Sequence, residues 1–146
     1  MTGRPFSAFR TGWDRPRSIY DLTVVGLTWP RPELDRRIDA RVDGYVARGL
    51  VAEVERLARA GLRSSATSAQ ALGYAQVLAH LDGRLSLDEA VEETKRRTRR
   101  FARRQERWFR ADARVAWFPS DPAGAAAYLL AKKRGPHRGP QRGRAA

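Results

Sequence analysis

Residues 86–110, "SLDEAVEETKRRTRRFARRQERWFR", decide the fold because they predict the longest helix of the chain. Ser86 is followed three residues later by Glu89, the pattern of a capping box, so we expect a helix that covers residues 87–110. At about 100° per residue, five arginines share one narrow stripe of this helix. They are Arg96, Arg100, Arg103, Arg107 and Arg110. The aromatic residues Phe101, Trp108 and Phe109 fall on another side, and we expect Trp108 and Phe109 to be buried in the core.

The charge of this helix is the most informative feature of the composition. The chain has 29 Lys and Arg against 16 Asp and Glu, which gives a net charge of +13. Much of the excess lies in residues 95–110, where Glu106 is the one acid, and in residues 132–144, which have no acid. Like charges one helical turn apart repel, so the row favours an anionic partner over a merely solvated face. Phosphate contacts carry no sequence information, so charge alone leaves DNA and RNA both open.

Composition excludes several classes of protein. The 146 residues include no cysteine, which excludes disulfides, thiolate catalysis and cysteine-ligated metals. We see no signal peptide and no long apolar segment, so we expect a cytoplasmic chain without membrane contact. The chain lacks the phosphate-binding patterns GxxxxGK[ST] and GxGxxG, and its two histidines, His80 and His137, are far apart. The residues alone therefore predict no catalytic centre.

The segments around the basic helix predict further helices and two strands. "YDLTVVGLTWP", residues 20–30, is typical of a buried strand with no neighbouring strand close in sequence. Apolar residues at helical spacing then predict one helix from Arg31 to a cap at Gly49 and a second helix closed by Gly61. A third helical segment ends at Leu81, and "RVAWFP" after the basic helix predicts a second strand.

Three patterns in this order carry a family resemblance. They are "ELDRRIDARVDGYVARGLVAEVERL" at residues 33–57, "TSAQALGYAQVLAHLDGRLSLDEAV" at residues 67–91 and "TRRFARRQERWFR" at residues 98–110. Together they resemble the C-terminal half of the bacterial tRNA dimethylallyltransferases, or tRNA isopentenyltransferases. The likeness covers about residues 2–118.

The resemblance implies a reaction, and it implies that part of the catalytic machinery lies outside these residues. The family transfers the dimethylallyl group of dimethylallyl pyrophosphate to the exocyclic amine of the adenine 3′ of the anticodon, assisted by Mg²⁺. Its P-loop and catalytic aspartate lie in an N-terminal α/β half with no counterpart in these residues. We therefore expect Mg²⁺ ligands outside this chain, no transfer by the chain alone, and two partners: the tRNA anticodon arm and a separately supplied P-loop half.

The resemblance also implies site residues. Arg41 matches an arginine near the pyrophosphate end of the family's channel, although it could instead pair with Asp39, Asp43 or Glu53. A fixed guanidinium suits phosphate. Gln70 could read a base edge or simply begin a helix. The segments that match tRNA contacts are Ser65, Ala66, Thr67, Ser68, Ala69 and Gln70, and Thr98, Arg99, Arg100, Phe101, Ala102, Arg103, Arg104 and Gln105. Ala75 and Glu106 depart from the family pattern, and both weaken the expected tRNA affinity.

The expected fold is mainly α with two short strands, the C-terminal fragment of an α/β P-loop-type fold. We expect residues 1–18 to be a loop left from the family's helical insertion, and residues 19–120 to form the helical part with its two strands. Residues 121–131 should form a short helix and residues 132–146 a disordered basic tail. We expect a monomer. The alternative functions are a non-catalytic RNA-binding module or an inactive remnant of the family.

Overall fold

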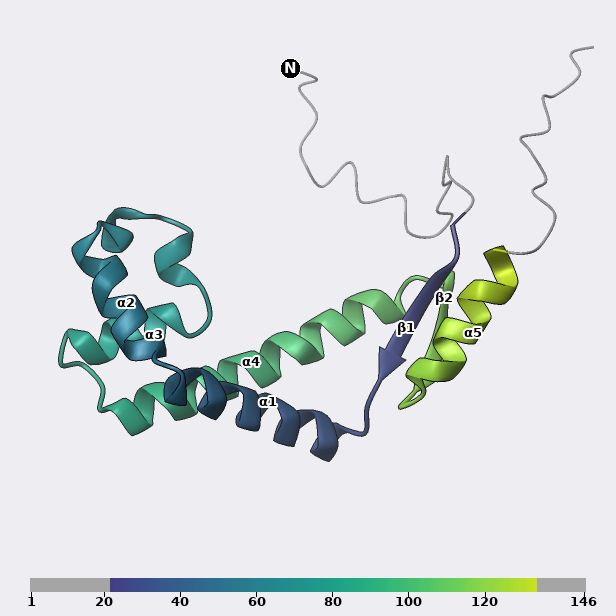
Figure 1. Cartoon of the computed structure of the whole chain (residues 1–146), viewed down its shortest axis with the longest axis horizontal. Coiled ribbons are helices and arrows are strands. Elements are labelled where there is room, and N and C mark those ends of the chain that lie inside the picture. The colour runs from purple at the N-terminus through teal and green to yellow at the C-terminus, as the bar shows by residue number, and fades with distance from the viewer. Residues whose placement is uncertain (1–21, 134–146) are drawn as a thin grey trace, which may run out of the picture. The chain divides into compact units, whose positions relative to one another are not determined.

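The computed structural model describes residues 22–133, which form two compact units (Figure 1). The helical unit, Pro30–Trp108, contains α1 (Arg31–Ala47), α2 (Leu50–Arg59), α3 (Tyr74–Leu81) and nearly all of α4 (Leu87–Arg110), with 3₁₀ turns at Leu62–Ser64 and Ser68–Gln70 between α2 and α3. The strand unit contains β1 (Val24–Thr28), β2 (Val115–Pro119) and α5 (Pro122–Lys133). The mainly helical fold with two short strands is confirmed.

The helix boundaries follow the glycine signals in the sequence. Gly49 separates α1 from α2 at a φ of 97°, and Gly61 follows α2 at the same φ. This left-handed conformation suits glycine, because a residue with a Cβ is strained there. Both predicted helix ends are therefore confirmed.

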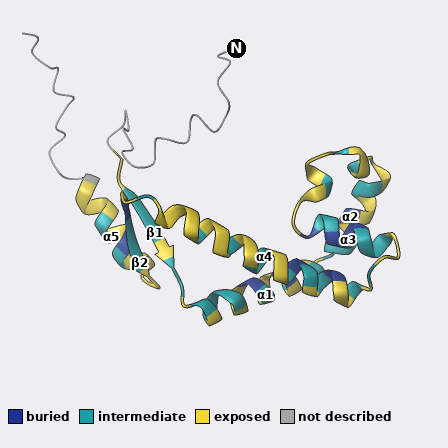
Figure 2. Cartoon of the chain, turned by 180° about the vertical axis from the view of Figure 1, so that it is seen from behind, coloured by how far each residue is buried: buried dark blue, intermediate teal, exposed yellow. Residues whose placement is uncertain are grey.

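The core of the helical unit lies between α2 and α3. Val54 is fully buried, and it packs with Val77 and Leu78, which are 3% and 6% exposed. Partly buried side chains surround this cluster; they include Leu50, Val51, Leu62, Tyr74 and Leu81. Figure 2 shows buried residues gathered at α2, α3 and the neighbouring part of α4. The α2–α3 end of the helical unit therefore has its own apolar core.

The predicted cap of α4 is confirmed. The backbone N–H of Ser86 donates to Glu89 Oε2 at 2.7 Å, and the backbone N–H of Glu89 donates to Ser86 Oγ at 3.2 Å. These two bonds satisfy donors that a helix N-terminus otherwise leaves open. The buried Thr94 hydroxyl donates to the Ala90 carbonyl at 2.7 Å, so this polar side chain also has a partner.

The two strands of the strand unit pair with each other in parallel. Their register runs from Val24 opposite Val115 to Thr28 opposite Pro119. Gly26 lies against Trp117, whose ring a Cβ at this position would meet at 2.5 Å. The first strand was expected to be buried, and this was wrong for its ends, because Leu22 is 50% and Leu27 is 47% exposed. A sheet of two strands and one helix leaves much of a strand's surface uncovered.

The C-terminal helix α5 ends at Lys133, so Lys132 and Lys133 belong to this helix rather than to the predicted tail. The Phe118 and Tyr128 rings pack with centroids 5.5 Å apart and so connect β2 to α5. The expectations for residues 1–18 and 134–146 lie outside the described residues. Within residues 22–133, no helix combines the length and apolar character needed to cross a membrane.

Candidate nucleic-acid interface

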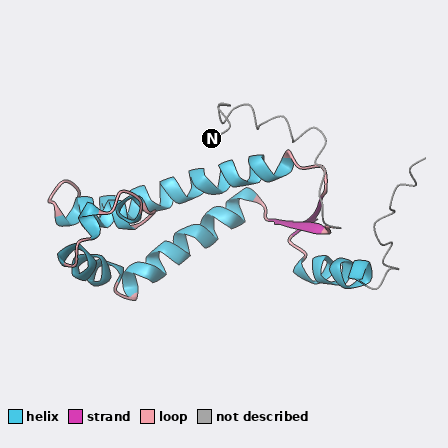
Figure 3. Ribbon diagram, turned by 90° about the horizontal axis from the view of Figure 1, so that it is seen from above, coloured by secondary structure: helices cyan, strands magenta, loops and turns pink. Residues whose placement is uncertain are grey.

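Ion pairs connect helix α4 to α1. Arg99 Nη1 lies 2.7 Å from both carboxylate oxygens of Asp39, and Lys95 Nζ lies 2.8 Å from Asp43. A third pair joins Arg31 to Glu106 at 3.5 Å. The partner residues on α4 have lower numbers as those on α1 have higher numbers, so the two helices run antiparallel. Figure 3 shows the two long helices side by side.

We call residues 95–110 of α4 the basic segment. An acidic side chain on α4 itself binds two further arginines of this segment. Glu93 accepts hydrogen bonds at 2.6 Å from Nε of both Arg96 and Arg97. The bond from Arg97, and then that from Arg96, hold the Glu93 pKa below its usual value. Asp43 and then Glu92 raise the Lys95 pKa. The beginning of the basic segment is therefore matched by carboxylates at neutral pH.

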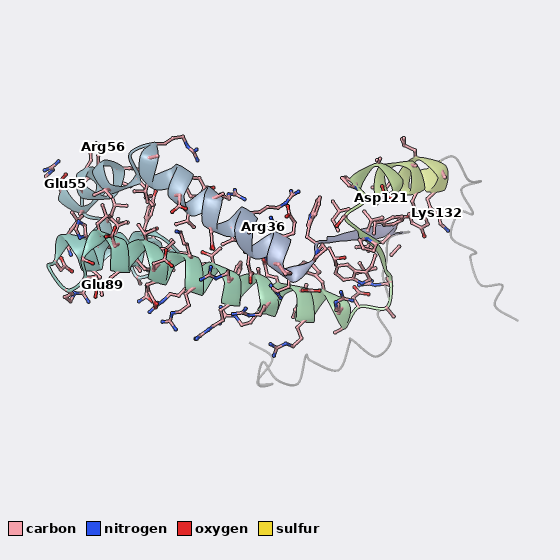
Figure 4. All side chains as sticks on the ribbon, turned by 90° about the horizontal axis from the view of Figure 1, so that it is seen from below. Arg36, Glu55, Arg56, Glu89, Asp121 and Lys132 are labelled. Atoms are coloured by element: carbon pink, nitrogen blue, oxygen red, sulfur yellow. The ribbon has the colours of Figure 1, made fainter. Side chains whose placement is uncertain are left out.

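The second half of the basic segment differs, because exposed arginines there lack acidic partners among the described residues; one of them, Arg104, lies against the Phe101 ring instead. Within the described part of the chain, Arg100, Arg103 and Arg107 form no ion pair or hydrogen bond through their side chains. Nitrogen-tipped side chains project from α4 on the side away from α1 (Figure 4). We call these three residues the arginine row. Three uncompensated cations on one helix favour an anionic ligand.

Other members of the predicted stripe have different surroundings. Arg96 is bound to Glu93, and the Arg110 guanidinium lies 5.1 Å from the Trp117 ring centroid within the strand unit. Glu106, which departs from the family pattern, pairs with Arg31 of α1. The negative charge of Glu106 is thus at least partly offset by α1, so it weakens the arginine row less than its position in the sequence indicates.

We expected Trp108 and Phe109 of α4 to be buried in the core, and this expectation was wrong. Trp108 is 55% and Phe109 is 44% exposed, although each takes part in at least one interaction. The apolar core described for the helical unit lies between α2 and α3 (Figure 2), and neither Trp108 nor Phe109 belongs to it. Phe101 is 41% exposed, with the Arg104 guanidinium 5.9 Å from its ring centroid.

The first predicted tRNA segment forms a turn on the surface before α3. The backbone N–H of Ser68 donates to Ser65 Oγ at 3.1 Å, and Ser68–Gln70 form a 3₁₀ turn. Gln70 is exposed and lines an open pocket of ≈ 380 Å³ that Arg97 also lines. Arg97 directly precedes the second predicted tRNA segment, although none of Thr98–Gln105 lines the pocket itself.

The cations of this pocket have acidic partners. Arg63 and Arg84 lie 2.6 Å and 2.7 Å from the carboxylate of Asp82, and Arg97 is bound to Glu93. The pocket therefore suits a neutral polar group better than a phosphate, and the Gln70 amide offers it both a donor and an acceptor.

Arg41 lies on an exposed part of α1, and the alternative in which a carboxylate holds it is wrong. Its Nε donates to Tyr45 Oη at 2.7 Å. Asp39 and Asp43 are bound to α4, and Glu53 accepts a hydrogen bond from the Tyr74 hydroxyl. Sequence reasoning missed Tyr45, although its spacing of four residues from Arg41 places both on one helix face.

The described residues do not fit a Mg²⁺ ion. Among residues 22–133, no three His, Asp or Glu side chains form a group that could hold a metal. Carboxylates are the usual protein ligands of Mg²⁺, and the acids near the basic segment are bound to arginine or lysine instead.

Comparisons with known proteins agree with the resemblance. The family model described as IPP transferase matches residues 1–112. The tRNA dimethylallyltransferase of Thermobifida fusca is 55% identical over 121 residues, which cover 83% of this chain and 37% of that protein. The enzyme of Kineococcus radiotolerans is 52% identical over 136 residues, which cover 89% of this chain and 41% of that protein.

Two solved structures share the fold. The full-length tRNA isopentenylpyrophosphate transferase of Bacillus halodurans matches 81% of this chain and 41% of its own with a TM-score of 0.73 and 38% identity. The transferase of Staphylococcus epidermidis matches 78% of this chain and 39% of its own with a TM-score of 0.71 and 31% identity.

The similarity extends along most of this chain but along only part of each relative. The chain spans about two fifths of the length of the curated relatives that it matches, and it corresponds to their C-terminal part. A family model that matches residues 1–112 and relatives that are more than 50% identical together establish the relationship. The chain therefore belongs to the IPP transferase family.

Proposed function

We propose that this chain is the tRNA-binding C-terminal portion of a tRNA dimethylallyltransferase. In this reaction the exocyclic amine of the adenine 3′ of the anticodon forms a bond to the dimethylallyl group, the bond from that group to pyrophosphate breaks, and pyrophosphate and the amine proton are released. The observation that carries the proposal is the arginine row, an exposed set of cations without acidic partners among the described residues of a chain of this family.

The arginine row would hold the backbone of the anticodon arm. Arg100 and Arg107 are separated by about 10 Å along the helix axis at ~1.5 Å per residue, a span that lets one helix contact more than one phosphate. Such contacts fix orientation and register without reading sequence. Among the predicted residues Thr98–Gln105, we assign phosphate binding to Arg100 and Arg103, whereas Arg99 serves to hold α4 on α1.

The turn at Ser65–Gln70 would supply a second contact. Gln70 is exposed at the pocket that Arg97 also lines, and the charges of this pocket are paired. An amide reads a base edge through one donor and one acceptor. We therefore assign base contact to Gln70 and backbone contact to the arginine row, a division of roles common in nucleic-acid interfaces.

The pyrophosphate end of the reaction would use Arg41 together with a P-loop half, supplied separately or on the same polypeptide. The 146 residues contain no GxxxxGK[ST] motif, and the described residues offer no Mg²⁺ ligand set. Dimethylallyl pyrophosphate and Mg²⁺ are therefore assigned mainly to that half, which would act on tRNA in the cytoplasm. We expect the chain to be a monomer.

Binding of an unmodified anticodon stem-loop, followed by fluorescence anisotropy, tests the RNA role. Reversing two charges of the arginine row, Arg100→Glu with Arg103→Glu, should weaken binding at least about tenfold, since each charge-assisted contact contributes ~1 kcal/mol or more. The control is Arg36→Glu with Arg59→Glu, which changes net charge equally at exposed sites bound to Glu33 and Glu55. Equal losses in both variants would refute a specific role for the row.

A transfer assay separates the transferase portion from a non-catalytic RNA-binding module. The 146-residue chain alone should give no dimethylallyl transfer, and turnover above background contradicts this expectation. The N-terminal P-loop half of the Thermobifida fusca relative is then added. Turnover that depends on both chains supports the transferase portion, whereas stem-loop binding without turnover favours the module.

A further inference from the structure

Tyr45 lies on the exposed surface of α1, with Arg41 four residues before it and Arg48, the residue that caps the helix, three residues after it. The Arg41 guanidinium carbon is 5.5 Å from the centroid of the Tyr45 ring, and the Arg48 guanidinium carbon is 5.2 Å from it. Arg41 Nε also donates to Tyr45 Oη at 2.7 Å. The ring is 41% exposed, so this arrangement lies at the surface rather than in the core. We call these three residues the tyrosine clamp.

The positive charges of the tyrosine clamp are not neutralised by nearby acids. Neither guanidinium forms an ion pair with any residue between 22 and 133. The two aspartates of this part of α1 are engaged elsewhere, since Asp39 binds Arg99 and Asp43 binds Lys95. Two cations held against one ring without a carboxylate repel each other, and an anion between or above them removes that cost.

The backbone beneath the clamp makes room for Arg48. A Cβ at Gly44 would stand 3.0 Å from Arg48 Nη1, so the guanidinium lies directly over this glycine. Glycine inside a helix costs about 0.5–1 kcal/mol relative to alanine. The chain thus has a helix-weakening residue at the position where it lets Arg48 fold back toward Tyr45.

We propose that Tyr45 positions Arg41 and Arg48 as a clamp for a phosphate-bearing ligand. The inference rests on the proposed function, because Arg41 is the residue assigned there to the pyrophosphate end of the reaction. The tyrosine hydroxyl engages Nε of Arg41, which leaves both terminal amino groups of the guanidinium for two parallel hydrogen bonds to phosphate oxygens. Arg48, which follows Tyr45 in the sequence, adds a second positive charge near the same ring.

The phosphate has two chemical sources, and both fit the same clamp. One is the pyrophosphate group of the prenyl donor, and the other is the phosphate backbone of the tRNA. A side chain fixed before binding loses less conformational entropy when the ligand arrives, so the hydroxyl of Tyr45 should raise affinity for either source. Removing that hydroxyl while keeping the ring isolates the positioning role.

The test follows the Arg41 Nε–Hε signal by NMR in the full chain. The signal is recorded during titration with pyrophosphate and, separately, with the anticodon stem-loop. The test variants are Tyr45→Phe and Arg48→Gln. Tyr128→Phe removes a hydroxyl from the strand unit and Arg36→Gln removes an exposed charge from the same helix, so these two serve as controls. Circular dichroism and melting temperature check that every variant folds.

We expect ligand to shift the Arg41 signal, and we expect each test variant to weaken the response roughly fivefold, equal to about 1 kcal/mol at 1.4 kcal/mol per tenfold. Each control should stay within about twofold. A response to pyrophosphate alone supports a clamp for the prenyl donor, and a response to the stem-loop alone supports one for RNA backbone. No shift with either probe, or folded test variants that match the controls, overturns the clamp.

The test of the tyrosine clamp can fail or succeed independently of the RNA role proposed for α4. The variant Arg100→Glu with Arg103→Glu should lose stem-loop binding and still show the Arg41 response to pyrophosphate. A chain that binds no stem-loop but retains the pyrophosphate response contradicts the proposed RNA role and leaves the clamp in place. A chain that binds the stem-loop through the arginine row without any Arg41 response contradicts the clamp and leaves the proposed RNA role in place.

Discussion

The pair between Asp39 and Arg99 should hold α4 on α1 rather than bind RNA. A double-mutant cycle tests this role through three variants: Asp39→Asn, Arg99→Gln and the two changes together. Arg99 Nη1 lies 2.7 Å from both carboxylate oxygens. The pair joins residues 60 positions apart in the sequence, so its loss acts on the packing of two helices rather than on one turn.

The expected coupling free energy follows from the burial of this pair. The two side chains are 25% and 34% exposed, which places the pair between a surface ion pair and a buried one. Surface pairs contribute about 0.2–1 kcal/mol, and hydrogen bonds to charged groups contribute about 1.5–3 kcal/mol. Allowing for partial solvent screening, we expect a coupling of about 1.5 kcal/mol.

Urea unfolding followed by circular dichroism measures the coupling, with the pair Glu55–Arg59 as the control. That pair lies within α2 at 3.0 Å, and its side chains are 71% and 50% exposed for Arg59 and Glu55; Figure 4 shows Glu55 at the periphery of the helix. An exposed pair of this spacing should give a coupling of about 0.3–0.5 kcal/mol. A coupling for Asp39–Arg99 no larger than that of the control refutes the structural role.

The same double variant separates a structural arginine from an RNA contact. Asp39→Asn with Arg99→Gln leaves the net charge unchanged, so stem-loop affinity should stay within about twofold if Arg99 makes no phosphate contact. A larger loss in a folded double variant returns Arg99 to the set of tRNA-binding residues.

Three further predictions concern the fold and the charges of α4. Val54→Ala removes two methyl groups from the fully buried centre of the core and should lower the free energy of unfolding by about 2 kcal/mol in urea; a loss under ~0.5 kcal/mol contradicts that core. Ser86→Ala removes the hydroxyl that accepts from the Glu89 N–H and should lower the free energy of unfolding by about 1 kcal/mol. Ser86→Asp keeps an acceptor at this position and should retain most of that stability. An NMR titration should give Glu93 a pKa below its usual value, because Arg97 and Arg96 bind the carboxylate. Its contribution to stability is therefore present above the unfolded-state pKa and lost as pH falls through the folded one; Arg97→Gln should raise the pKa, and an equal rise in Arg100→Gln contradicts the pairing.

Local signals predicted much of the fold. The glycines at 49 and 61, the capping box at Ser86 and the helical spacing of apolar residues each act within a few residues, so the sequence alone indicated where the helices end. The pairing of β1 with β2 joins segments about 90 positions apart, and no pattern within either strand specifies its partner. The sequence therefore predicted both strands but not that they pair with each other in parallel.

The charges of the site were harder to predict than its helices. Sequence spacing placed Arg96 and Arg100 in one stripe, yet Glu93 binds the first and no described acid binds the second. The partners of Arg99 and Glu106 lie on α1, and only the packing of the two helices brings them together. The same limit explains Trp108, whose apolar character indicated a core that lies at the other end of the helical unit.

The salt dependence of stem-loop binding tests the central claim most directly. Each phosphate neutralised contributes about −0.7 to −0.9 to the slope of log Kobs against log salt concentration. Replacing both Arg100 and Arg103 with Gln should therefore make the slope shallower by about 1.4 to 1.8 units, whereas Arg36→Gln with Arg59→Gln should change it by less than ~0.5. If the two double variants change the slope equally, or neither changes it, the arginine row of α4 is not the surface that binds the tRNA.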